Sequence, residues 1–214
     1  MDTQTVLLII TLSYVIGSFP TAYIVGRLNG FNIFNVGSGN MGTTNVLRAL
    51  GLGWGALVFL VDISKGILAV WLARQIAPGN SQASASAISA VAVVTGHNWS
   101  FIASLISGSI RGGKGAATAG GTWLIIMPAF VMAVPLVIMA LIIATTRYMS
   151  LGVLVSTFVG GLILLGLVLT HQMDPAYLLY ALVGLMVFYR HRDNIKRLLA
   201  GNERRLGERA EVQK

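Results

Sequence analysis

Three short polar segments carry most of the residues of this chain that could do chemistry. They comprise residues 37–48, 111–115 and 189–198, and each combines cationic side chains with glycines or amides. Glycines let backbone N–H groups turn toward an anion, while lysine, arginine and histidine neutralise it or hydrogen-bond to it. We therefore interpret the three segments as parts of one anion-binding site.

The first segment has the composition of a phosphate cradle. Its candidate substrate-binding residues and its single cation are Ser38, Gly39, Asn40, Thr44, Asn45 and Arg48. A helix beginning within this segment would add its N-terminal N–H groups, which favour an anion. The alternative is a glycine-rich turn at a membrane interface, with helix caps and an arginine that reaches toward the headgroups.

The second segment places Lys114 between Gly112, Gly113 and Gly115, ahead of an apolar helix that we expect to begin at Ala116. The backbone can then approach a phosphate while the ammonium neutralises it. The spacing is not that of a Walker A loop, in which Ser or Thr follows the lysine. A purely structural turn remains the alternative for this segment taken alone.

The third segment follows the last apolar window and contains His191, Arg192 and Asn194. His191 and Asn194 are three residues apart, so a continuing helix would present both on one face. His191 could act as an acid, a base or a hydrogen-bond donor to phosphate, because an ordinary histidine titrates near neutrality. The alternative is a basic helix end beside the membrane.

Other polar residues lie in or next to the apolar windows. Asp62 and Lys65, at i and i+3, are expected to form an ion pair, because unpaired charges in a membrane are costly. His97 is either a packing residue or a ligand. Ser150 either donates to a phosphate or caps the helix that follows it.

The composition identifies a membrane protein. Hydrophobic residues make up 55% of the 214 residues and charged residues only 10%, with a mean hydropathy of +0.77. Soluble domains carry about 25% charged residues. We expect one multi-pass domain over residues 1–214, with a basic tail from about residue 199 to 214.

The apolar windows and the positive charges together predict a topology. The windows are 6–25, 53–72, 83–96, 116–146, 151–170 and 176–188. A single helix over 116–146 would be about 46 Å long, against a hydrocarbon core of about 30 Å. Two passes there, turning near Pro128 and Pro135, put 13 of the 15 Lys and Arg on one side. The positive-inside rule then predicts an all-α bundle of seven transmembrane helices, with the N-terminus outside and the C-terminus in the cytoplasm.

The acidic residues are few and narrow the chemistry. There are seven Asp and Glu, and none lies in the expected cytoplasmic loops before residue 190. We therefore expect neither a metal site nor a cofactor. Cysteine is absent, which excludes a cysteine acyl-enzyme. The cations in the loops between the spans are explained by the membrane topology and by attraction to anionic lipid headgroups. We expect neither nucleic acid nor an obligate protein as a partner.

Taken in order, the segments resemble the PlsY family, the bacterial acyl-phosphate:glycerol-3-phosphate acyltransferases. The matching blocks are residues 37–48, Gly96-His97 with 111–115, 147–150 and 191–198, and the stretch 98–111 departs from the family pattern. The resemblance implies transfer of a fatty acyl group from acyl phosphate to the 1-hydroxyl of glycerol 3-phosphate. The products would be lysophosphatidic acid and phosphate, in the first acylation step of phospholipid biosynthesis.

The expected mechanism is direct attack within a site that faces the cytoplasm at the bacterial inner membrane. Arg48, Lys114, His191 and Asn194 are the candidate catalytic residues, and positioning of the two substrates supplies most of the acceleration. The hydroxyl proton goes either to a substrate phosphate or to His191. The competing hypothesis is a membrane transporter of an organic phosphate, since glycine-rich half-helices also occur in transporters.

Overall fold

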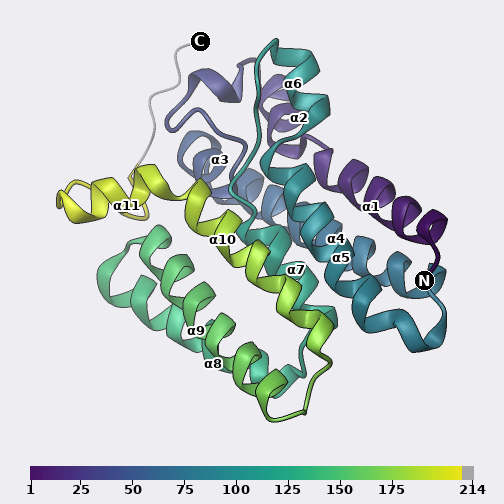
Figure 1. The fold of residues 1–214 in the computed structure, drawn as a ribbon. Helices are drawn as coiled ribbons and strands as arrows, with labels where there is room; N and C mark the ends of the chain where they lie inside the picture. The colour runs from purple at the N-terminus through teal and green to yellow at the C-terminus, as the bar shows by residue number, and fades with distance from the viewer. Residues whose placement is uncertain (209–214) are drawn as a thin grey trace.

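The computed structural model describes residues 1–208 of the chain, and in these the all-α prediction is confirmed. Its long helices pack side by side, with α10 crossing in front and α11 at one end (Figure 1). The α-helices are α1 (Thr3–Ser18), α2 (Thr21–Leu28), α3 (Thr43–Leu50), α4 (Leu52–Ile76), α5 (Gln82–Asn98), α6 (Phe101–Ser107), α7 (Ala116–Ile126), α8 (Ala129–Thr146), α9 (Met149–Leu169), α10 (Ala181–Arg190) and α11 (Arg192–Leu199). The 3₁₀ helices are η1 (Ile33–Asn35), η2 (Gly79–Ser81) and η3 (Pro175–Tyr180).

Several of these helices have the length and composition of membrane spans. The continuous segment Thr3–Leu28, α4, α8 and α9 are each long and apolar enough to cross a bilayer. Their outer faces expose large apolar side chains that a bilayer would cover, among them Phe130 at 78% and Leu141 at 60%. The chain is therefore an integral membrane protein, as its composition predicts.

The long window 116–146 forms two helices, as we predicted from its length. α7 ends at Ile126, Pro128 caps α8, and Pro135 lies inside α8 rather than at the turn. The 11 residues of α7 span about 16 Å, roughly half of a hydrocarbon core of about 30 Å. This segment is thus shorter than a full transmembrane helix.

Glycines let the central helix α5 and its neighbours approach closely. A Cβ on Gly17 of α1 would lie 2.0 Å from the carbonyl oxygen of Val93, and one on Gly96 of α5 would lie 2.2 Å from that of Tyr14. Helices in membranes often pack through such small residues. The resulting contact holds the last turn of α5, which contains His97 and ends at Asn98, beside α1.

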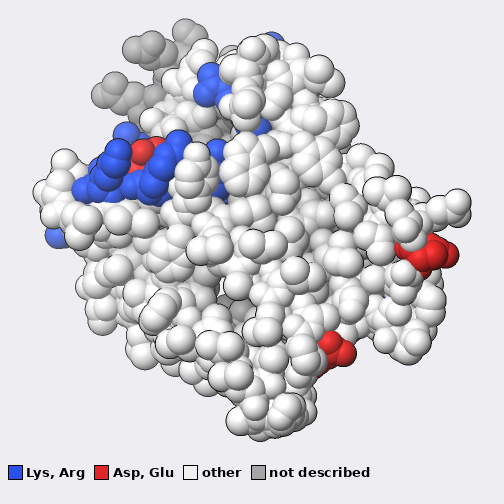
Figure 2. Space-filling model, viewed as in Figure 1, with Lys and Arg blue, Asp and Glu red and all other residues white. Residues whose placement is uncertain are grey.

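The two ends of the bundle differ in charge. Lys and Arg gather around the end that carries α11, whereas the Asp and Glu seen elsewhere lie at distant edges of the molecule (Figure 2). Arg74 lies at the opposite end, where its guanidinium donates to Ser86 at 2.8 Å and to Tyr177 at 3.5 Å. The three polar segments meet at the cationic end.

The stretch that departs from the family pattern forms a helix of its own. Ser100 caps α6 by accepting a hydrogen bond from the N–H of Ala103, and Gly108 ends the helix in a left-handed conformation. The N–H of Ser100 donates to the carbonyl of Arg111 at 2.9 Å. The insertion therefore returns the chain to the end of α5, where the glycine loop begins.

Candidate active site

The second and third polar segments meet through a hydrogen bond. Lys114 stands directly before Gly115, whose φ of +76° turns the chain into α7. The ammonium of Lys114 donates to the side-chain oxygen of Asn194 on α11. Asn194 is only 5% exposed, and Lys114 is partly buried. Two of the four candidate catalytic residues are thus in contact.

Glu203, which no sequence motif marks, completes this contact. One of its carboxylate oxygens accepts from the amide of Asn194 at 2.7 Å and from the hydroxyl of Ser150 at 3.0 Å, and the other accepts from Arg197 at 2.9 Å. Ser150 therefore bonds a buried carboxylate. Its alternative role as a helix cap is wrong, because Tyr148 is the N-cap of α9. The chain after α11 returns to the site at this point, since Arg48 also donates to the carbonyl of Arg204 and Arg147 to that of Leu206.

His191 lies at the one-residue break between α10 and α11 and is 4% exposed. The expected continuous helix is therefore interrupted, yet His191 and Asn194 are both buried. His191 Nδ1 is 2.8 Å from the carbonyl oxygen of Val187, so this nitrogen carries the proton and donates it. Burial, and next the charge of Lys114, lower the pKa of His191 to about 4. The ring is neutral at neutral pH, and Nε2 can accept a proton.

The same burial acts on Lys114. It lowers the pKa of the ammonium from 10.5 to about 8, while the negative charge of Glu203 acts in the opposite direction. The N–H groups of Lys114 and Gly115 donate to no acceptor within the described part of the chain. Together with the start of α7 they present donors and a positive charge to an anion.

Arg48 brings the first segment to the same place. Its guanidinium donates to the carbonyl of Arg204 at 3.0 Å, which ties α3 to the segment that carries Glu203. Burial, and next the charge of Arg204, lower the pKa of Arg48. The buried Nε of Arg48 and the hydroxyl of Thr43 have no hydrogen-bond partner among residues 1–208. These two buried atoms are therefore unsatisfied within the described part of the chain.

Two predicted substrate-binding amides serve the turn itself. Asn45 accepts from the N–H of Ser38 at 3.0 Å and donates to the carbonyls of Val36 and Asn40. Asn40 accepts from the N–H of Gly42 at 2.8 Å and donates to the Ser38 hydroxyl. Their polar atoms hold residues 36–45 in shape, so these contacts do not support direct substrate binding by Asn40 or Asn45.

The remaining predicted residues divide into two groups. Gly112 and Gly113 are buried in the loop before Lys114, and Thr44 is half-buried in the first turn of α3. Ser38 is exposed, and Gly39 has a φ of +65° that turns the chain beside it. Arg192 is exposed and lies 4.7 Å over the ring of Tyr189, away from the buried group. Its expected role in substrate binding is not supported by this position.

An apolar groove lies next to the cluster formed by Lys114, His191 and Asn194. It has a volume of about 470 Å³ and lies between α5 and α10, lined by Val91, Trp99, Leu182, Leu185, Met186 and Tyr189. Arg190 follows Tyr189 and donates to the carbonyl of Gly113 at 2.8 Å, which connects the groove to the glycine loop. Within residues 1–208 no group of three or more His, Asp or Glu is placed to hold a metal ion.

Comparisons with known proteins agree with this geometry. The chain is 43% identical to glycerol-3-phosphate acyltransferase 1 of Deinococcus radiodurans over 97% of this chain and 98% of the relative. It is 37% identical to the glycerol-3-phosphate acyltransferase of Clostridioides difficile over 99% of this chain and 100% of the relative. A family model described as glycerol-3-phosphate acyltransferase matches residues 7–201.

A crystal structure of PlsY (YgiH), an integral membrane glycerol 3-phosphate acyltransferase in its glycerol 3-phosphate form, superposes with a TM-score of 0.82 and 31% identity, covering 94% of this chain and 96% of the other. The chain belongs to the PlsY family of glycerol-3-phosphate acyltransferases. A second crystal structure of PlsY (YgiH), in its lysophosphatidic acid form, matches this acyltransferase with a TM-score of 0.79 and 30% identity over 95% of this chain and 96% of the other. Family membership decides for the enzyme and against the transporter.

Proposed function

We propose that this acyltransferase moves a fatty acyl group from acyl phosphate to the 1-hydroxyl of glycerol 3-phosphate, by direct attack and without an acyl-enzyme. The observation that carries the proposal is the contact of Lys114 with Asn194, beside Arg48 and His191 and at the end of an apolar groove. The named ligands of the two similar crystal structures supply the acceptor and the product, glycerol 3-phosphate and lysophosphatidic acid.

The two cations that we expect to bind phosphate are Lys114 and Arg48. Lys114 is linked to Glu203 through Asn194, and Arg48 donates to the carbonyl of the next residue, Arg204. Arg48 Nε and the Thr43 hydroxyl are unpartnered among the described residues. Both substrates carry phosphate, so two anions must be held next to each other. Fixed cations and backbone N–H groups hold them and stabilise the charge that develops in the transition state.

The chemical step is an attack of the acceptor hydroxyl on the acyl carbonyl carbon. A carbon–oxygen ester bond forms, the bond from that carbon to the phosphate oxygen breaks, and phosphate leaves with the electron pair. The hydroxyl proton goes to Nε2 of His191 or to a phosphate oxygen. The first route fits a neutral imidazole whose Nδ1 proton is held by Val187. Holding the reactants in line supplies most of the acceleration.

The groove between α5 and α10 suits the acyl chain. It opens on the outer surface of the bundle and is lined mainly by apolar side chains. Val91 of α5 lies within the groove. Ala85, Ala87 and Ala90 are instead fully buried against other helices.

The membrane arrangement follows from the charged end. We propose seven passes, counting the half-length helix α7 as one of them, with the N-terminus outside and the site in the cytoplasm of a bacterial cell. This places Lys114, Arg48 and the basic segment after α11 on the side favoured by the positive-inside rule. Soluble glycerol 3-phosphate would enter from the cytoplasm and the lipid donor from the inner leaflet.

The test is an acyl-donor comparison with purified protein. Labelled glycerol 3-phosphate is incubated with palmitoyl phosphate, palmitoyl-CoA or palmitoyl-acyl carrier protein, and labelled lysophosphatidic acid is extracted. We expect product from palmitoyl phosphate alone. Product from a thioester with none from palmitoyl phosphate would refute acyl phosphate as the donor. An acyl group trapped on the protein would refute direct transfer.

A further inference from the structure

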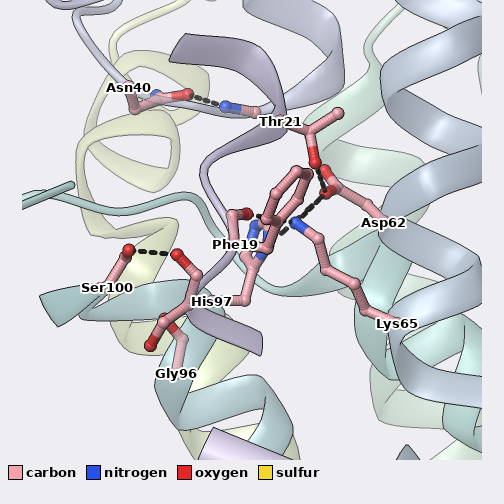
Figure 3. Close-up of polar contacts among 10 residues, drawn as sticks. Phe19, Thr21, Asn40, Asp62, Lys65, Gly96, His97 and Ser100 are labelled. Atoms are coloured by element: carbon pink, nitrogen blue, oxygen red, sulfur yellow. Dashed lines mark hydrogen bonds and ion pairs between the residues drawn. The ribbon is translucent and has the colours of Figure 1, made fainter. Parts of the chain in front are cut away.

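A buried ionic cluster lies beneath the glycine loop and takes no part in the proposed chemistry. Asp62 and Lys65 of α4 are 2% and 6% exposed, and Lys65 Nζ is 2.6 Å from Asp62 Oδ1, which confirms the predicted pair. Lys65 Nζ also donates at 2.7 Å to the carbonyl of Phe19, where the chain breaks between α1 and α2. Thr21 donates to Asp62 at 3.4 Å (Figure 3).

His97 connects this cluster to the glycine loop. Its Nδ1 lies 3.8 Å from the same oxygen of Asp62, too far for a hydrogen bond, and makes no hydrogen bond in the described part of the chain. On the other side of the ring, a Cβ added to Gly113 would lie 2.0 Å from Nε2, so the ring rests directly against Gly113. A shift of the ring therefore moves the residue before Lys114.

The loop is held firmly on its other sides. The N–H of Gly113 donates to the carbonyl of His97 at 2.9 Å. Arg190 donates to the carbonyls of Gly113 and Gly112 at 2.8 and 3.3 Å. A Cβ on Gly112 would lie 2.0 Å from the carbonyl oxygen of Asn98. The loop is therefore held between the His97 ring and the Arg190 guanidinium.

Stability alone is a poor reason for charges at this position. Desolvation of a buried ion pair often outweighs its attraction, and apolar pairs of similar volume are frequently as stable or more so. A carboxylate close to an imidazole nitrogen, in contrast, attracts the N–H at that nitrogen and so favours one orientation of the ring. Asp62 faces Lys65, Thr21 and His97, and only His97 touches the loop.

We propose that Asp62 orients His97, and that these two positioning residues set where the Gly112–Gly113 loop holds Lys114 relative to the substrate phosphate. The inference rests on the proposed function, in which Lys114 binds that phosphate. It assigns a role in substrate binding to an ion pair inside the membrane-spanning part of the protein.

The test separates positioning from folding by neutralising the whole pair. Asp62→Asn with Lys65→Gln removes the charge that faces His97 without leaving an unpaired buried charge. We expect a melting temperature close to that of the wild type and a KM for glycerol 3-phosphate raised about tenfold, with a smaller change in kcat. Arg74→Gln, in the polar cluster at the opposite end, is the control and should leave that KM unchanged. A folded double variant with wild-type KM and kcat would overturn the proposal.

A second experiment applies if the neutral pair does not fold. Gly113→Ala pushes a Cβ into the His97 ring. His97→Ala removes that ring, so the double variant has room for the added Cβ. We expect the combined loss in kcat/KM to be at least about tenfold smaller than the product of the single losses. Losses that multiply would contradict the contact. If Lys114→Ala leaves the KM for glycerol 3-phosphate unchanged, the proposed function fails by itself, whatever the Asp62 variants do.

Discussion

The ammonium of Lys114 donates a hydrogen bond to the side-chain oxygen of Asn194, 80 residues further along the chain. Asn194 in turn donates to the carboxylate of Glu203 at 2.7 Å. A neutral amide therefore stands between the cation and the carboxylate. Lys114 is held in place without a direct ion pair, and its positive charge remains available to a phosphate.

The pKa of Lys114 predicts an alkaline limit to activity. Burial lowers this pKa to about 8, so the ammonium is charged below that pH and neutral above it. We expect kcat/KM for glycerol 3-phosphate to fall by about tenfold per pH unit above the limit. Lys114→Arg keeps its charge, so its residual activity should persist to higher pH. The same alkaline limit in both proteins would show that another group titrates.

Glu203 should affect both this limit and the stability. Its negative charge raises the pKa of Lys114 against the effect of burial. Glu203→Gln should therefore move the alkaline limit to lower pH, and weaker hydrogen bonds to Ser150, Asn194 and Arg197 should reduce the free energy of unfolding by about 1–3 kcal/mol. Rate–pH profiles and thermal melts measure the two effects. Asp193→Asn, an exposed change on α11, is the control and should alter neither.

The contrast between Glu203 and Asp62 shows what the sequence could predict. Asp62 and Lys65 lie in an apolar window at helical spacing, so local rules are enough to identify the pair. The helix start at Ala116 and the turn at Pro128 are local in the same sense. Glu203 lies in a short basic stretch whose composition is that of a solvated tail. Only the return of the chain after α11 brings it to Ser150, a contact with a separation of 53 residues.

The roles of Asn40 and Asn45 were obscured for a similar reason. Amides in a glycine-rich segment suit either a ligand or the turn itself, and composition does not distinguish the two. The structure directs their polar atoms to the backbone of residues 36–42. The sequence identified the segments that form the site, but tertiary contacts decide which side chains remain free for a substrate.

The groove between α5 and α10 predicts a change in acyl-chain preference. Met186→Trp should partly fill the groove of about 470 Å³. We expect kcat/KM for long-chain acyl phosphates to fall about tenfold relative to short-chain ones, because the lost apolar contact grows with chain length. The KM for glycerol 3-phosphate should not change. Leu68→Trp, in the separate groove between α1 and α4, is the matched control. An equal loss for all chain lengths would place the acyl chain elsewhere.

The proposed topology predicts opposite labelling at two exposed turns. The chain has no cysteine, so Ser109→Cys and Asn80→Cys each introduce a single reactive thiol. A membrane-impermeant maleimide should label position 80 in intact spheroplasts and position 109 only in inside-out vesicles. The reverse pattern would invert the protein in the membrane, and labelling of both from one side would contradict the proposed passes.

The central claim is that Arg48 and Lys114 bind substrate phosphate in one site. Its most direct test is kcat/KM for glycerol 3-phosphate with palmitoyl phosphate as donor, measured for Arg48→Ala and Lys114→Ala beside Lys196→Ala, an exposed lysine of α11. We predict losses of about a hundredfold or more for the first two, with their helical circular dichroism preserved, and a rate near wild type for the third. Near-normal activity of the Arg48→Ala or Lys114→Ala protein would contradict the claim.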